Sequence, residues 1–191
     1  MENKTLLITC FEPFGGRDAN ASREATDALP AALHGFDLRR ICLPVEFGRA
    51  PEIAAAAVDE LHPAAVVCVG EAGGRAKVTP EMVAINLRHA RIPDNAGAEP
   101  HDEPVLPGGE NALFTTLPVR AMTSAMLDAG VPAEVSYTAG TYVCNDLMYL
   151  MLLHCAPLGI PCGFVHVPAG GELDTETVAR GLCAAIEVLA R

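Results

Sequence analysis

The chain alternates short apolar runs with helical patterns along almost its whole length, and this alternation limits the fold more than any other feature. Apolar runs of strand length lie at 5–9, 40–45, 64–69, 82–87, 133–137 and 163–167. Helical patterns lie between or after them, at 20–29, 51–61, 117–129, 142–154 and from 175 onward. Such alternation is typical of a parallel sheet with helices on both faces. The sequence therefore predicts an α/β fold, a three-layer α/β/α sandwich around a mixed, mostly parallel sheet.

Length and composition favour one domain. A chain of 191 residues has about the length of a single domain. Half of the residues are hydrophobic and 19% are charged, which is enough apolar material for a packed core. We therefore expect one domain over residues 1–191. The longest stretch without helix or strand pattern, 90–111, carries four prolines, and it is predicted to be a functional cover or a contact loop.

Charge and cysteine content exclude several classes of protein. The net charge is −11, which opposes binding to nucleic acid or to an acidic membrane surface. No apolar run reaches the ~18 residues that span a bilayer, and the first residues do not resemble a secretory leader. The seven cysteines contain no Cys-x-x-Cys pair, so we expect reduced thiols, mostly in the core, and no disulfide framework or zinc site. These features predict a cytoplasmic protein.

Cys144 is the cysteine best placed for chemistry. It follows a predicted strand and the turn 138–141, and it begins the apolar helical pattern. A helix N-terminus stabilises a thiolate, and its free N–H groups can bind a developing oxyanion. The alternative is an ordinary core cysteine, which is the common fate of this residue type.

A thiol nucleophile needs a base, and His166 is the best candidate. It ends an apolar strand just before Pro168, at the sheet edge where α/β folds place catalytic groups. A structural histidine is the alternative interpretation. The third member would be an acid that orients the imidazole, and spacing alone does not choose among Glu81, Glu71 and Asp94.

The glycine-rich stretch 70–74 suggests a phosphate loop, but it lacks the P-loop lysine and the dinucleotide-binding glycine spacing. Two alternatives to a cysteine hydrolase stay open at this point. One is a nucleoside phosphorylase or a related α/β enzyme that uses 70–74 for phosphate. The other is a binding or assembly protein of the same fold without activity.

Several blocks of the sequence together resemble the pyroglutamyl peptidase I family, the pyrrolidone-carboxylate cysteine peptidases. The blocks are Phe-Glu-Pro-Phe-Gly-Gly at 11–16, Gly-Glu-Ala-Gly-Gly-Arg at 70–75, Thr-Pro-Glu at 79–81 with Val-Ala-Ile-Asn at 83–86, Arg-Ile-Pro-Asp-Asn at 91–95, Ser-Tyr-Thr-Ala-Gly-Thr-Tyr-Val-Cys-Asn at 136–145, and Phe-Val-His-Val-Pro at 164–168. They follow the family's order and cover nearly the whole chain, which makes the resemblance far more specific than any single motif.

The resemblance implies an omega peptidase that hydrolyses the bond after an N-terminal pyroglutamyl residue, through a thioester and a Glu81, Cys144 and His166 triad. It also implies that Arg91 stabilises the oxyanion and that no metal or organic cofactor takes part. The implied partners are peptides with N-terminal pyroglutamate and other copies of the chain in a homotetramer.

The substrate's lactam ring is flat and uncharged, which suits an aromatic pocket. The resemblance assigns this pocket to Phe11, Phe14 and Tyr142, although packing under the first loop is the alternative for the two phenylalanines. Position 71 is Glu where the family has Gln, and a carboxylate can only accept hydrogen bonds. Three outcomes are open for Glu71: protonation in the pocket, exposure to water, or weaker recognition of the lactam. Cys10 in place of Gly, and Tyr142 in place of Phe, are the other departures.

Overall fold

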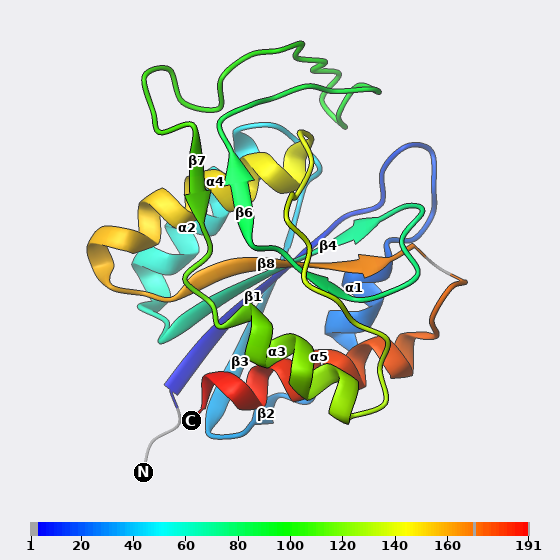
Figure 1. Ribbon diagram of the computed structural model, residues 1–191. Helices are drawn as coiled ribbons and strands as arrows, with labels where there is room; N and C mark the ends of the chain where they lie inside the picture. The colour runs from blue at the N-terminus through cyan, green and yellow to red at the C-terminus, as the bar shows by residue number, and fades with distance from the viewer. Residues whose placement is uncertain (1–3, 170, 191) are drawn as a thin grey trace.

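A six-stranded sheet forms the centre of the molecule (Figure 1). The computed structural model describes residues 4–169 and 171–190. The strand order is β2-β3-β1-β4-β8-β5, with β1 at Lys4–Phe11, β2 at Ala32–Leu33, β3 at Phe36–Leu43, β4 at Ala65–Ala72, β5 at Thr79–Pro80 and β8 at Cys162–Pro168. The four inner strands run parallel, and the two short edge strands β2 and β5 run antiparallel to their neighbours. The predicted mixed, mostly parallel sheet is confirmed.

Helices cover both faces of this sheet. One face carries α1 (Ala21–Asp27), α3 (Val119–Asp128) and α5 (Thr175–Leu189), and the other carries α2 (Arg49–Leu61) and α4 (Val143–Cys155), which a short 3-10 turn at Ala156–Leu158 follows. Each face has its own buried apolar cluster, because the inner strands are apolar on both sides. The predicted three layers are therefore present. Within the described residues, no helix is both long and apolar enough to cross a bilayer.

A small ladder stands apart from the main sheet. It pairs β6 (Val83–Ile85) with β7 (Ala112–Phe114) in antiparallel register, and Figure 1 shows the segment between them projecting beyond the sheet. Residues 90–111 contain no helix or strand, as predicted. One isolated bridge joins Glu103, within this segment, to Arg88, which lies just before it. The strand expected at 82–87 is shorter than predicted, because β6 covers only Val83–Ile85.

The strand predicted at 133–137 is wrong. This segment makes only two isolated bridges, Val78 with Ala133 and Glu81 with Ser136. The backbone N–H of Val78 donates to the carbonyl of Pro132 and that of Met82 to the carbonyl of Ser136, but Pro80, midway between the two donors, has no N–H to donate. The ladder is therefore interrupted at its centre.

Among the other strands, two boundaries differ most from the sequence prediction. β3 begins at Phe36 rather than near residue 40, because its pairing with β1 starts at Lys4. β4 continues through Gly70 to Ala72, where a turn was predicted, because each of these residues pairs with a residue of β8. The second difference matters most, since it brings Gly70 into register with His166.

Candidate active site

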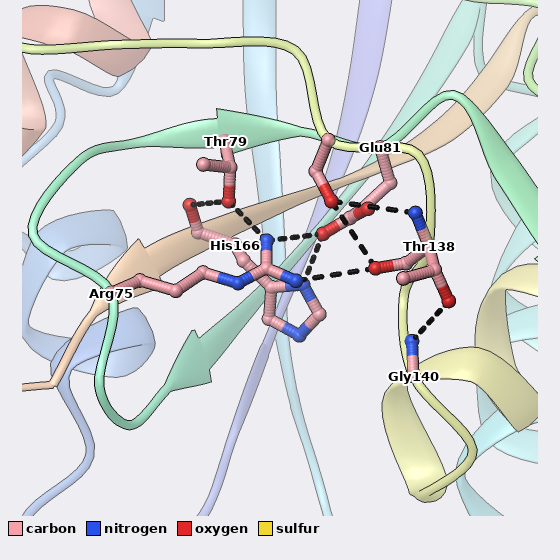
Figure 2. Close-up of polar contacts among 7 residues, drawn as sticks. Arg75, Thr79, Glu81, Thr138, Gly140 and His166 are labelled. Atoms are coloured by element: carbon pink, nitrogen blue, oxygen red, sulfur yellow. Dashed lines mark hydrogen bonds and ion pairs between the residues drawn. The ribbon is translucent and has the colours of Figure 1, made fainter.

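The candidate triad residues come from three elements that meet at one edge of the sheet. Cys144 is the second residue of α4, His166 lies near the end of β8, and Glu81 lies between β5 and β6. His166 Nδ1 lies 2.7 Å from Glu81 Oε1, as Figure 2 shows. Glu81 is fully buried and His166 nearly so. The geometry selects Glu81 among the three acids that spacing left open, because it is the one bonded to the imidazole.

Gly70 leaves the space that the Cys144 thiol occupies beside the β4–β8 strand pair. A Cβ added to Gly70 would lie 3.0 Å from Cys144 Sγ and 2.6 Å from Cζ of Phe164. Gly70 is the register partner of His166 in the β4–β8 ladder, and the rings of Phe164 and His166 lie 4.7 Å apart between centroids. The missing side chain at position 70 therefore lets Cys144 pack directly over the strand pair that carries His166.

Gly70→Ala is expected to damage both activity and stability. The added methyl group meets the Phe164 ring below the normal contact distance, so the ring and the thiol must shift. Overpacking of this kind costs about 1–3 kcal/mol of unfolding free energy. Chemical denaturation would measure the loss, and turnover at this site should show a lower kcat. A variant with wild-type stability and rate would contradict the proposed role of Gly70.

Two buried polar side chains fix the first turn of α4 behind Cys144. Asn145 accepts a hydrogen bond from the Ile85 N–H at 2.9 Å and donates to the carbonyls of Ile85 at 2.8 Å and Leu87 at 3.0 Å. Asp146 accepts from Arg88 Nε at 2.6 Å and from the Gly48 N–H at 2.8 Å. Sequence reasoning missed both residues, although adjacent Asn and Asp at the start of so apolar a helix were a usable signal.

Burial governs the protonation of the resting site. Burial, followed by the charge of Glu81, raises the pKa of the Cys144 thiol to about 12, and Arg75 opposes this rise. Burial also lowers the pKa of His166, against the hydrogen bond and charge of Glu81. At neutral pH the pair is therefore a thiol beside a neutral imidazole. The expected stabilisation of a thiolate by the helix N-terminus is outweighed here, so the imidazole must act as a base when the thiol attacks.

A cavity of about 630 Å³ opens in front of the thiol. Every predicted site residue except Glu81 lines it: Phe11, Phe14, Glu71, Arg91, Tyr142, Cys144 and His166. Tyr142 lies between two phenylalanine rings, with centroid distances of 6.2 Å to Phe14 and 5.3 Å to Phe47. Glu81 lies behind His166, where an orienting acid belongs. The cavity thus joins a thiol, a base and aromatic walls.

Comparison with known proteins identifies the family. The family model described as pyroglutamyl peptidase matches residues 4–190. The chain belongs to the pyroglutamyl peptidase family. It is 42% identical over 193 residues to the pyrrolidone-carboxylate peptidase of Streptococcus pyogenes serotype M4, covering 95% of this chain and 90% of the relative. It is 44% identical over 197 residues to that of Levilactobacillus brevis, covering 96% of each chain.

Solved structures of this family superpose on the whole fold. Bacillus amyloliquefaciens pyroglutamyl peptidase I matches with a TM-score of 0.93 and 35% identity, over 98% of this chain and 97% of the other. The pyrrolidone carboxyl peptidase of Thermococcus litoralis matches with a TM-score of 0.91 and 33% identity, over 97% and 92% of the two chains. The resemblance stated from the sequence is thereby confirmed, for the family and for the fold.

Glu71, the main departure from the pyroglutamyl peptidase pattern, is engaged within the protein. Its side chain is 2% exposed and forms an ion pair with Arg17 through Oε1. Its other oxygen accepts a hydrogen bond from the Ala21 N–H at 2.8 Å. The side chain therefore does not face water. It ties the loop after Phe11 and Phe14, and the start of α1, to β4.

Asp94, the remaining acid candidate, organises a loop instead of the imidazole. It accepts hydrogen bonds from the backbone N–H groups of Phe47, Ala96 and Ala98, at 2.8–2.9 Å. Tyr142 donates to the carbonyl of the preceding residue, Pro93, at 3.1 Å. Asp94 therefore supports one wall of the cavity from outside.

The structure also adds wall residues that sequence reasoning passed over. The cavity is also lined by His89, Asn20, Thr141 and Arg75. His89 lies in a polar loop, and the sequence analysis gave neither His89 nor Arg75 a role.

The other cysteines lie largely where the sequence predicted, in the core: Cys10, Cys68, Cys155 and Cys162 are buried, whereas Cys42 is exposed and Cys183 is half-buried. Cys42 is exposed because it lies in β3, near the edge of the sheet.

Proposed function

We propose that residues 1–191 form one cysteine peptidase domain that removes N-terminal pyroglutamate from peptides, with Cys144 as nucleophile, His166 as base and Glu81 as orienting acid. The observation that carries the proposal is the His166 to Glu81 contact of 2.7 Å beside a thiol that opens into an aromatic cavity. Membership of the pyroglutamyl peptidase family supports the substrate class, since relatives are named for this residue.

The reaction begins with transfer of the Cys144 proton to His166 Nε2 as Sγ attacks the pyroglutamyl carbonyl carbon. The oxyanion that forms is stabilised by the backbone N–H of Cys144, at the start of α4, and by the Arg91 guanidinium on the cavity wall. His166 then gives its proton to the leaving amine as the C–N bond breaks. The pyroglutamyl group stays on Sγ as a thioester, and the peptide departs with a free N-terminus.

Water completes the reaction. His166 takes a proton from a water molecule, which attacks the thioester carbonyl, and the C–S bond breaks to release pyroglutamate. The Cys144 sulfur regains a proton from His166. Glu81 accepts from Nδ1 throughout, so Nε2 keeps the lone pair that the base needs.

The cavity walls favour an uncharged lactam. Phe11, Phe14 and Tyr142 supply flat apolar surface, and Glu71 holds the loop that follows Phe11 and contains Phe14. A free N-terminal ammonium would lose its hydration among these rings at a cost of ~2 kcal/mol or more, and the cavity's carboxylate, Glu71, is already paired with Arg17. The pocket therefore discriminates against ordinary N-termini.

Assembly and location belong to the same proposal. We infer a homotetramer in the cytoplasm, supported by exposed aromatic side chains such as Phe114 at 70% and Tyr137 at 62%, and by free thiols throughout the described residues. Sedimentation velocity should give a tetramer, and a species of 20 kDa would count against it.

Substrate preference tests the activity directly. Pyroglutamyl-arylamide, prolyl-arylamide and glutaminyl-arylamide differ in charge and ring chemistry but share a leaving group. We expect release of the arylamine from the pyroglutamyl compound only. Equal hydrolysis of all three, or of none, would overturn the proposed function.

A further inference from the structure

Arg75 links the candidate acid to the turn that leads into the nucleophile's helix. It lies in the loop between β4 and β5, and its Nη1 donates to Glu81 Oε1 at 2.6 Å. The same nitrogen contacts Thr79 Oγ1, while Nη2 donates to the Thr138 carbonyl at 3.2 Å. Figure 2 shows the guanidinium between these groups, with Thr138 close to the start of the helix. One planar side chain therefore connects residues 79–81 to the turn at Thr138.

The carboxylate of Glu81 depends on this contact. Its Oε1 accepts hydrogen bonds from both Arg75 and His166, whereas Oε2 is buried and has no hydrogen-bond partner among the described residues. Glu81 is 0% exposed and Arg75 is 27% exposed, so the guanidinium brings the counter-charge from the cavity side. Without Arg75 the buried carboxylate would lose its counter-charge and one of the two hydrogen bonds that fix Oε1. It would then be free to turn away from the imidazole.

Arg75 also acts on the two reacting groups electrostatically. Its charge opposes the rise in the pKa of Cys144 and adds to the fall in the pKa of His166. The other charges that act on this pair come from Glu81 on both groups and from Glu71 on Cys144, with the Cys68 thiol as a further neighbour of Cys144. Of these groups, Arg75 is the cation that faces both the thiol and the imidazole.

We propose that Arg75 is a positioning residue of the reaction, which holds Glu81 against His166 and ties the Thr138 turn that precedes Cys144. This inference rests on the proposed function for its kinetic readout. Its geometry is that of a forked donor serving a carboxylate and a carbonyl at once, a task for which the single ammonium of lysine is not equivalent.

The test compares Arg75→Met, Arg75→Lys and Lys77→Met with wild type. Lys77 is the matched control, because it belongs to the same loop but pairs at the surface with Glu134. For Arg75→Met we expect kcat to fall about 10- to 100-fold, since small errors in the position of catalytic groups are costly. We also expect the acid limb of the kcat/KM profile to move to lower pH, because release of Glu81 removes the hydrogen bond and the charge that raise the pKa of His166, and these outweigh the direct effect of Arg75. Lys77→Met should match wild type.

Arg75→Lys separates charge from geometry. It should keep the acid limb near its wild-type pH and recover only part of kcat, because it retains the charge and loses the fork. If Arg75→Met does not fold, this variant carries the test alone. A wild-type kcat for Arg75→Lys, or a wild-type pH profile and kcat for Arg75→Met, would overturn the proposal.

Alkylation by iodoacetamide supplies a readout that needs no substrate. At a fixed pH near 8, Cys144 in Arg75→Met should react more slowly than in wild type, because its pKa rises further without the nearby cation. Equal rates would contradict the electrostatic part of the proposal. If the wild-type protein does not hydrolyse pyroglutamyl-arylamide, the proposed function fails, and the alkylation rates still decide whether Arg75 acts on the thiol.

Discussion

Cys144→Ala is expected to abolish hydrolysis of pyroglutamyl-arylamide. Without Sγ no thioester can form, and the remaining cavity can only bind and polarise the substrate. Loss of a nucleophile in a triad lowers kcat by about 10⁶-fold in comparable enzymes. Progress curves at high enzyme concentration would measure the residual rate. Binding of a pyroglutamyl ligand should persist, since the aromatic walls are untouched.

Cys155→Ala is the matched control for this substitution. Cys155 is the last residue of α4, is buried, and does not line the cavity. The substitution Cys155→Ala removes a sulfur from the same helix, at the end away from His166, so we expect nearly wild-type kcat. Cys144→Ser should retain far less activity than wild type, because the hydroxyl is a poorer nucleophile. Wild-type turnover in Cys144→Ala would exclude Cys144 as the nucleophile.

Glu81→Gln is expected to give the second-largest loss. The amide can present its NH₂ group to Nδ1 and so favour the tautomer in which Nε2 carries the proton and cannot act as a base. A comparable change in a serine protease triad lowers kcat by about 10⁴-fold. The amide also leaves the Arg75 guanidinium without its buried counter-charge. We therefore expect kcat to fall by about 10³-fold or more, with KM changed far less.

Glu134→Gln provides the control for Glu81→Gln. Glu134 is also a carboxylate paired with a cation, but it is exposed and pairs with Lys77. Its loss should alter neither kcat nor stability beyond the small effect of a surface ion pair. Thermal unfolding of both variants would separate loss of structure from loss of chemistry. A folded Glu81→Gln with wild-type kcat would remove Glu81 from the mechanism.

The thiol and the imidazole were predictable because their signals are local. Cys144 lies where a turn meets an apolar helix, and His166 lies near the end of an apolar strand, and both elements form as predicted. The layers of the fold follow equally from periodicity, since the inner strands are apolar on both sides. The family resemblance agreed with these placements and added Glu81.

Glu81 was not predictable from spacing alone because its neighbours are set by tertiary pairing. Whether an acid reaches the imidazole depends on the antiparallel pairing of β5 with β8, which brings Thr79 into register with His166. A strand of two residues leaves no periodicity to detect. The failed strand at 133–137 has a related cause, since it depended on a donor that Pro80 does not have.

Gly70 and Arg75 escaped prediction for a further reason. Glycine in a Gly-rich stretch indicates a turn, yet Gly70 continues β4, and its role is to leave room for side chains from α4 and β8. Arg75 is a loop cation whose partners are Thr79 and Glu81 nearby in the chain and Thr138 far along it. Such roles depend on close approach between distant parts of the chain, which a single sequence does not encode locally.

Reaction with the chloromethyl ketone of pyroglutamic acid is the most direct test of the central claim. The lactam directs the reagent into the cavity, Sγ of Cys144 displaces chloride from the methylene carbon, and His166 takes the thiol proton. Peptide mapping by mass spectrometry should find one adduct per chain, on Cys144, with activity lost in proportion, and the prolyl analogue should react much more slowly. Inactivation with the adduct on another residue, or equal reaction of the two reagents, would contradict the account.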